Sequence, residues 1–135
     1  MELIDLVKNW IKKADGDLKT AKDELNTTDP VTTAICFHAQ QCVEKYLKTY
    51  LVFHKKDFKK IHDVAEHLEL CKEIDGSFDT LREYKIAELT RYATKMRYGD
   101  DFHCPSKDEA QEAVVKAEKV KGFVLKKLEK EGLKL

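Results

Sequence analysis

The segment Arg97–Pro105 concentrates side chains that could act on a phosphate. It contains Arg97 and His103, which are separated by five residues. The planar guanidinium of an arginine can hold phosphate oxygens in pairs, and a histidine with a pKa near neutrality can take or give a proton. The two side chains beside one phosphate would suit metal-free cleavage of RNA. The ordinary alternative is a solvated connector in which Arg97 pairs with Asp100 or Asp101.

A second candidate is a polar stripe on the helix expected over residues 30–53. Its members recur at helical spacing and are His38, Gln40, Gln41, Glu44, Lys45 and Lys48. Amides there could recognise a base, and lysines could bind a phosphate. The ordinary alternative is a solvated helix face on which Glu44 supports Lys48 through an i,i+4 ion pair.

A third candidate is the loop His54–Lys60, which follows that helix. It contains four lysines, and Phe53 and Phe58 lie around them. This combination resembles a small phosphate-binding patch. A solvated basic linker is the simpler interpretation of the same residues.

The histidines and cysteines do not form a metal-binding pattern. Cys36 and His38 are too close in sequence, and His62 and His67 would lie about 140° apart around a helix. The four cysteines show no CxxC pair and fall in or beside expected helices, which favours reduced, mostly buried thiols. The sequence also lacks a Gly-rich phosphate loop, a nucleophile elbow and a paired-carboxylate helix motif. We therefore expect neither a metal nor a cofactor.

The elements that position these residues are expected to be helices. Apolar residues recur at steps of three and four, and the two prolines and five glycines are too few for a sandwich or barrel. Asp29 and Pro30 are expected to begin the second helix, and Ser106 with Glu109 forms a capping box for the last. The pattern predicts an all-α, up-and-down bundle of about five helices. Their expected ranges are 3–25, 30–53, 61–75, 79–96 and 106–132.

The length of 135 residues suits one domain, spanning residues 1–135. The 25 Lys and Arg residues balance 25 Asp and Glu residues, so no net field favours nucleic acid or membrane, and any basic surface must be local. No stretch approaches the ~20 apolar residues of a membrane span, and the first residues lack a signal-peptide pattern. We expect a cytoplasmic protein without a membrane segment.

Three segments together resemble a known family. They are the run Phe37–Lys48, with the pattern F-H-x-Q-Q-x-x-E-K-x-L-K, the run Lys60–Val64 with His62 and Asp63, and the run Tyr92–Tyr98 with its Arg-Tyr pair. In this combination they are similar to the hallmark segments of the minimal HEPN domain, named for higher eukaryotes and prokaryotes nucleotide-binding. The resemblance covers nearly the whole chain.

The resemblance implies a helical bundle that forms a homodimer. In prokaryotes it also implies pairing with a small separate nucleotidyltransferase, often as a toxin and antitoxin. Its name suggests nucleotide binding, and the residues carried over for this are Gln40, Gln41, Lys45, Lys48, His62, Arg97 and Tyr98.

Many relatives in that family are metal-independent ribonucleases that use an Arg, four to six residues and then a His. Arg97 and His103 have this spacing. Two residues depart from the common patterns. Tyr98 follows the Arg where the ribonuclease branches usually have a polar residue, and Gly99 replaces the Pro of the minimal branch's Arg-Tyr-Pro.

The sequence thus favours three hypotheses. The first is a non-enzymatic nucleotide- or RNA-binding subunit that works with a nucleotidyltransferase. The second is a metal-independent ribonuclease in which His103 acts as acid or base and Arg97 stabilises the phosphate. The third is a protein-interaction module without chemistry of its own.

Overall fold

A computed structural model describes residues 2–93 and 104–135 of the chain. Every regular element in these residues is helical, which confirms the predicted all-α class. The α-helices are α1 (Leu3–Leu25), α2 (Thr32–Phe53), α3 (Val64–Ile74) and α5 (Lys107–Lys130), and two 3₁₀ helices, η1 (Gly76–Tyr84) and η2 (Ile86–Tyr92), lie between α3 and α5.

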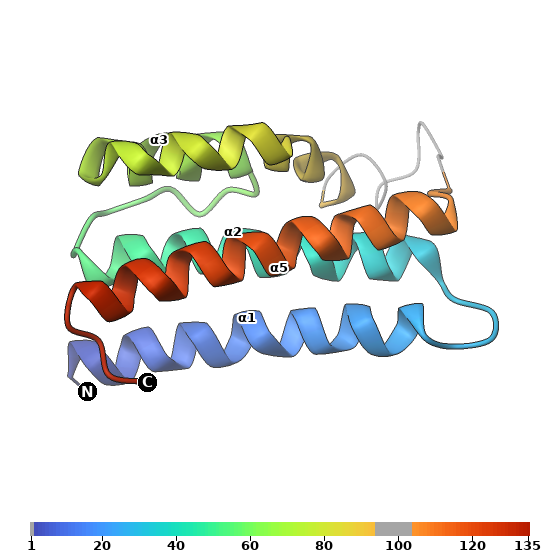
Figure 1. Cartoon of the computed structure of the whole chain (residues 1–135), viewed down its shortest axis with the longest axis horizontal. Coiled ribbons are helices and arrows are strands. Elements are labelled where there is room, and N and C mark those ends of the chain that lie inside the picture. Colours follow the sequence, from blue (N-terminus) through green and yellow to red (C-terminus); the bar gives the residue numbers. More distant parts are fainter. Residues whose placement is uncertain (1, 94–103) are drawn as a thin grey trace.

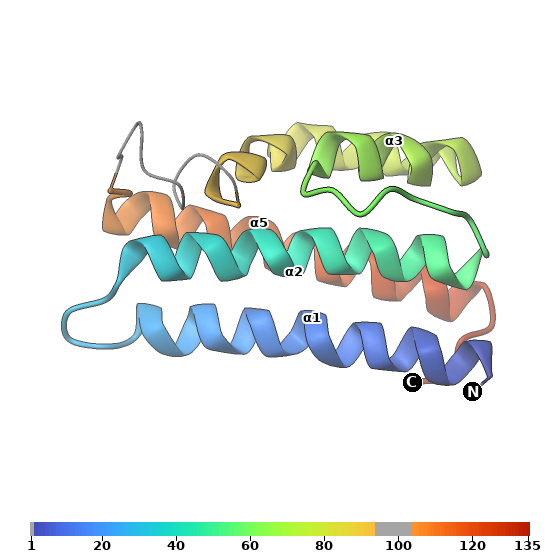
Figure 2. The ribbon, with the colours of Figure 1, turned by 180° about the vertical axis from the view of Figure 1, so that it is seen from behind.

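Three long helices form the body of the bundle (Figure 1). The α2 helix packs against both α1 and α5, and α3, η1 and η2 lie on the side of α2 and α5 away from α1, as the reverse view also shows (Figure 2). Cys104, just before α5, contacts Thr32 at the start of α2, and Tyr50 near the end of α2 donates to Glu131 just after α5. The α2 and α5 helices therefore run in the same direction.

The core lies around α2 because this helix has neighbours on several sides. The predicted apolar arc of α2 is confirmed, since all its members are buried: Ile35, Ala39, Cys42, Val43, Tyr46, Leu47 and Tyr50. The predicted stripe of α5 is buried as well, from Ala110 to Leu128. Cys36, Cys42 and Cys71 are buried free thiols and Cys104 is exposed, which confirms the prediction of mostly buried, unbridged cysteines.

The predicted start of α2 was wrong by two residues. The helix begins at Thr32 rather than Pro30, and Asp29 does not cap it. Instead, the Glu24 carboxylate at the end of α1 accepts from the backbone N–H of Val31 at 2.9 Å and from the Thr27 hydroxyl at 3.2 Å. A side chain of the preceding helix thus satisfies an amide at the start of the next one.

The prediction of an α-helix over residues 79–96 was also wrong for residues 79–92. These residues form 3₁₀ helix on both sides of Lys85. A 3₁₀ helix has three residues per turn, so side chains at i and i+3 share a face. The buried residues Ile86, Leu89 and Tyr92 follow this spacing, as do Phe78 and Leu81 before them. Lys85, with a φ of 55°, separates the two segments. Residues 94–96 of the predicted helix lie outside the described residues.

Both ends of α5 follow from the sequence. Ser106 caps its start, since the Ser106 hydroxyl accepts from the backbone N–H of Glu109 at 3.1 Å. At the other end Gly132 takes a φ of 101°, and the N–H of Leu133 bonds to the carbonyl of Leu128 at 2.9 Å. This is a Schellman arrangement, in which glycine is favoured because it lacks a Cβ.

In the parts of the chain that the structure describes, no helix combines the length and the apolar character that crossing a membrane requires.

Leu89→Ala tests the contribution of the three-residue spacing to stability. Leu89 is 2% exposed, so we expect its truncation to lower the free energy of unfolding by about 2–5 kcal/mol. Glu83→Ala, at an exposed position of η1, is the matched control, with an expected change within about 0.5 kcal/mol. Urea unfolding followed by circular dichroism measures both. Equal losses in the two variants would contradict the packing described for η2.

Candidate functional site

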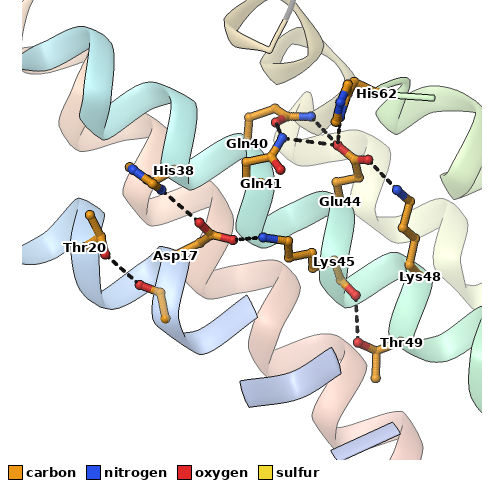
Figure 3. Close-up of polar contacts among 11 residues, drawn as sticks. Asp17, Thr20, His38, Gln40, Gln41, Glu44, Lys45, Lys48, Thr49 and His62 are labelled. Atoms are coloured by element: carbon orange, nitrogen blue, oxygen red, sulfur yellow. Dashed lines mark hydrogen bonds and ion pairs between the residues drawn. The ribbon is translucent and has the colours of Figure 1, made fainter. Parts of the chain in front are cut away.

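The polar stripe of α2 is organised by a buried carboxylate, that of Glu44 (Figure 3). The Glu44 side chain is only 2% exposed. Lys48 Nζ lies 2.6 Å from Glu44 Oε1, and Gln40 Nε2 donates to Glu44 Oε2 at 2.8 Å. His62 Nδ1 lies 2.9 Å from the same Oε2. Gln40 and Lys48, each one turn away on α2, and His62 from outside the helix therefore meet at this carboxylate.

Gln41 adds a second layer to this group. Its Nε2 donates to Gln40 Oε1 at 2.5 Å and approaches Glu44 Oε2 at 3.5 Å. We call the set Gln40, Gln41, Glu44, Lys48 and His62 the Glu44 cluster. Each donor in it either contacts the carboxylate or supports a residue that does.

Two opposing effects set the protonation of Glu44. Burial by itself raises the pKa of the carboxyl, because a charged group loses hydration. The hydrogen bonds from Lys48, His62 and Gln40 outweigh burial and lower the pKa below its ordinary value. Glu44 is therefore ionised at neutral pH, and the positive charge of Lys48 balances its own.

A second carboxylate, that of Asp17 on α1, contacts two other residues of the stripe, His38 and Lys45. Lys45 Nζ lies 2.5 Å from Asp17 Oδ2, and His38 Nδ1 lies 2.8 Å from Oδ1 (Figure 3). Nearby, the Tyr46 hydroxyl donates to Asp15, which also pairs with Lys121 of α5 at 3.0 Å. These contacts tie α1 to α2 and α5.

The alternative that the stripe is a solvated face is wrong for its central part. Gln40 and Glu44 are buried, and Lys48 is 11% exposed, because α2 is covered on several sides. The i,i+4 ion pair between Glu44 and Lys48 that this alternative included is confirmed. The pair is thus a partly buried contact rather than a surface one.

His62 is held over Glu44 by the segment before α3. His67 is fully buried on α3, and its Nε2 lies 3.0 Å from the carbonyl oxygen of Ile61, the residue before His62. Burial lowers the pKa of His67, so the ring is neutral and Nε2–H donates to that carbonyl. Asp63, the residue after His62, caps α3 by accepting from the N–H of Glu66 at 3.3 Å. His62 is therefore fixed from both sides along the chain.

The structure brings together four of the predicted binding residues, Gln40, Gln41, Lys48 and His62, and places Lys45 apart from them on Asp17. Arg97, Tyr98 and His103 lie outside the described residues. The exposed part of the group is His62, whose side chain is 53% exposed, while Gln40 is fully buried.

Sequence reasoning missed Asp17 as a partner of the stripe. The residue lies 28 positions before Lys45, and nothing in the local pattern connects the two. The only signal was an acidic residue at the edge of the apolar stripe of α1. Among the described residues, no group of three or more histidine, cysteine or acidic side chains is arranged to hold a metal ion.

Comparison with protein families gives one match, in which the family model described as the HEPN domain covers residues 7–128. Comparisons with curated proteins and with solved structures give no match.

Glu44→Gln tests the cluster through its pH dependence. The substitution leaves Lys48 partly buried without its counter-charge, and we expect it to lower the free energy of unfolding by about 3–5 kcal/mol at neutral pH. Because the folded state lowers the pKa of Glu44, this stabilisation is present above the ordinary value of 4.5 and is lost as the pH falls through the folded-state pKa. The difference between wild type and variant should therefore shrink below pH 4.5.

Glu73→Gln is the matched control, because Glu73 is 60% exposed and pairs with Lys56 at 3.2 Å. A surface pair of this kind contributes at most about 1 kcal/mol. Denaturant unfolding at several pH values measures both variants. A Glu44→Gln protein that is as stable as wild type at neutral pH would contradict the role given to this carboxylate.

Proposed function

The chain belongs to the HEPN domain family, and on this premise we propose that it is a nucleotide- or RNA-binding protein that acts as the accessory partner of a small nucleotidyltransferase. Family membership supports a nucleotide- or RNA-related function in general. The partner, the toxin–antitoxin pairing and the homodimer come from the resemblance of the hallmark segments.

The observation that carries the proposal is the placement of His62. Its Nδ1 faces the buried Glu44 carboxylate, which fixes the plane of the ring, and half of the side chain is exposed. The ring's other nitrogen, Nε2, makes no hydrogen bond in the described part of the chain. A histidine oriented by a carboxylate in this way presents one nitrogen to a ligand in a fixed direction.

Charge balance limits what this site can attract. Lys48 is neutralised by Glu44, so the Glu44 cluster is not strongly cationic as a whole. Lys59 and Lys60, which precede His62 in the chain, are exposed and make no ion pair among the described residues. They supply the positive charge that an anionic ligand beside His62 requires. Of the predicted basic loop, the proposed site thus includes only these two lysines, together with His62.

The arrangement favours binding over catalysis within the described residues. The Glu44 carboxylate and the Lys48 ammonium are engaged with each other, so neither is poised as a free acid, base or nucleophile. A ligand phosphate can accept from His62 and from the lysines of the preceding loop. Gln41 is half-buried, and its Nε2 donates within the Glu44 cluster.

Calorimetric titration with nucleoside triphosphates and with short single-stranded RNA tests the proposal. We expect His62→Ala to weaken binding by about tenfold to a hundredfold, because it removes one charge-assisted contact worth about 1.5–3 kcal/mol. His54→Ala is the matched control, because His54 also faces a glutamate, Glu131, at 2.9 Å, and we expect it to bind like wild type. The proposal is rejected if the protein binds neither nucleotides nor RNA and also binds no nucleotidyltransferase.

A metal-independent ribonuclease is the second candidate function, favoured by the five-residue separation of Arg97 and His103. In this mechanism the ribose 2′-oxygen bonds to the adjacent phosphorus and the bond from phosphorus to the 5′-oxygen breaks, while Arg97 stabilises the charged phosphate. His103 acts as base or acid: it takes the proton of the 2′-hydroxyl or gives a proton to the departing 5′-oxygen, and water makes the other proton transfer. The products are a cyclic phosphate and a free 5′-hydroxyl. The mechanism requires the two side chains to meet at one phosphate.

Incubation of RNA with purified protein in the presence of EDTA tests this candidate. If the protein is a nuclease, we expect Arg97→Ala and His103→Ala each to reduce the cleavage rate by at least about a hundredfold. His54→Ala is the control, because it removes a histidine that belongs neither to the proposed binding site nor to the reacting groups, and it should cleave like wild type. Cleavage that persists unchanged in both loop variants would assign it to a contaminant or to other residues.

A further inference from the structure

A shallow groove lies on α1. It has a volume of about 700 Å³, and it is lined by Leu6, Asn9, Trp10, Lys12 and Lys13. Trp10 is the single tryptophan of the chain. Trp10 is half-buried, and the part of its indole that lines the groove lies beside Lys12 and Lys13.

The Trp10 ring is held from the side of the bundle. Phe58 meets it edge-on, with ring centroids 6.2 Å apart and an interplanar angle of 80°. Lys48 Nζ lies 6.0 Å from the Trp10 centroid and 5.5 Å from that of Phe58. Because Lys48 also contacts Glu44 at 2.6 Å, it connects the Trp10 ring to the Glu44 cluster.

The charges in the groove are unbalanced. Lys19 and Lys22, further along α1, have carboxylate partners in Asp23 and Glu118. Lys12 and Lys13 make no ion pair among the described residues, and no acidic side chain lines the groove. Lys13 Nζ instead lies 5.9 Å from the Trp10 ring centroid. The groove is therefore cationic as well as apolar.

A ligand that matches both properties has a flat aromatic part and a negative charge beside it. An unpaired nucleobase with its flanking phosphates has this combination, because every base presents a π-face and every linkage carries a charge. An acidic amphipathic helix would match the charge of the groove, but its side chains would not stack on the face of Trp10 as a nucleobase does. The aromatic and cationic groups together favour nucleic acid.

We propose that the groove on α1 is a stacking site for an unpaired base of single-stranded RNA, with the base against Trp10 and the flanking phosphates at Lys12 and Lys13. The inference rests on the proposed RNA-binding function and deepens it by naming a single strand as the ligand. Through Lys48 the strand continues towards His62. The binding surface then extends over α1 and α2 instead of being confined to the Glu44 cluster.

Because Trp10 is the only tryptophan, its fluorescence reports on this groove alone. We expect titration with a short oligoadenylate to quench the emission, since a stacked base contacts the indole directly. Trp10→Leu should bind the same RNA, measured by anisotropy of a labelled strand, about tenfold more weakly, which is the loss expected for one stacked base. Trp10→Phe should retain most of the affinity because it keeps an aromatic face.

The paired substitution Lys12→Gln and Lys13→Gln should weaken RNA binding and reduce its salt dependence. Lys8→Gln with Lys19→Gln removes the same number of charges elsewhere on α1 and should change the salt dependence less. Circular dichroism melting of each variant identifies any loss of folding. If Trp10→Leu unfolds, the RNA affinity of Trp10→Phe is compared with that of wild type instead.

The outcomes separate this inference from the proposed function. RNA that binds without quenching Trp10, and equally well to Trp10→Leu, would overturn the stacking site and leave the proposed function intact. No binding of RNA at all would overturn both. If Trp10→Leu instead changed the molecular mass in solution and left RNA binding unaltered, the groove would be a protein interface and the inference would be wrong.

Discussion

The arrangement of this bundle depends on one constraint, the burial of the Glu44 carboxylate on the central helix. An ionised group out of contact with water is tolerated only when a counter-charge and hydrogen bonds replace its hydration. Lys48 supplies the charge, and Gln40 and His62 supply hydrogen bonds. Any change to the helix packing that moved one of these partners would leave a buried charge unsatisfied, so the cluster penalises alternative packings.

The same constraint links the core to the surface. His62 can reach Glu44 only because the segment before α3 folds back over α2, where His67 and the cap formed by Asp63 hold it. On the other side, Lys48 extends from Glu44 towards Trp10 and Phe58. A carboxylate inside the bundle thus orients an imidazole and an ammonium at its rim. His62 thus both satisfies the buried charge and carries the proposed binding site.

Much of the fold could be predicted because long amphipathic helices have a clear sequence signal. The apolar arcs of α2 and α5 followed the 3.6-residue period closely, and Ser106 and Gly132 fixed the ends of α5. The region from Gly76 to Tyr92 was predicted incorrectly because its apolar residues follow a period of three, which looks irregular when an α-helix is assumed. The start of α2 was missed because Glu24, a residue of the preceding helix, accepts the backbone hydrogen bond that was expected to go to a local cap.

The sequence by itself determined the helical class, the central position of α2 and the residues of the polar stripe, because these depend on local spacing. It predicted the i,i+4 pair of Glu44 with Lys48, but it could not say which carboxylates His38, Lys45 and His62 would meet, since those contacts cross between elements. Only the tertiary structure decided that Lys45 and His38 contact Asp17 and that His62 contacts Glu44. It also decided that Trp10 and Phe58, 48 positions apart, meet beside Lys48, because packing of the helices and not local sequence sets such distances.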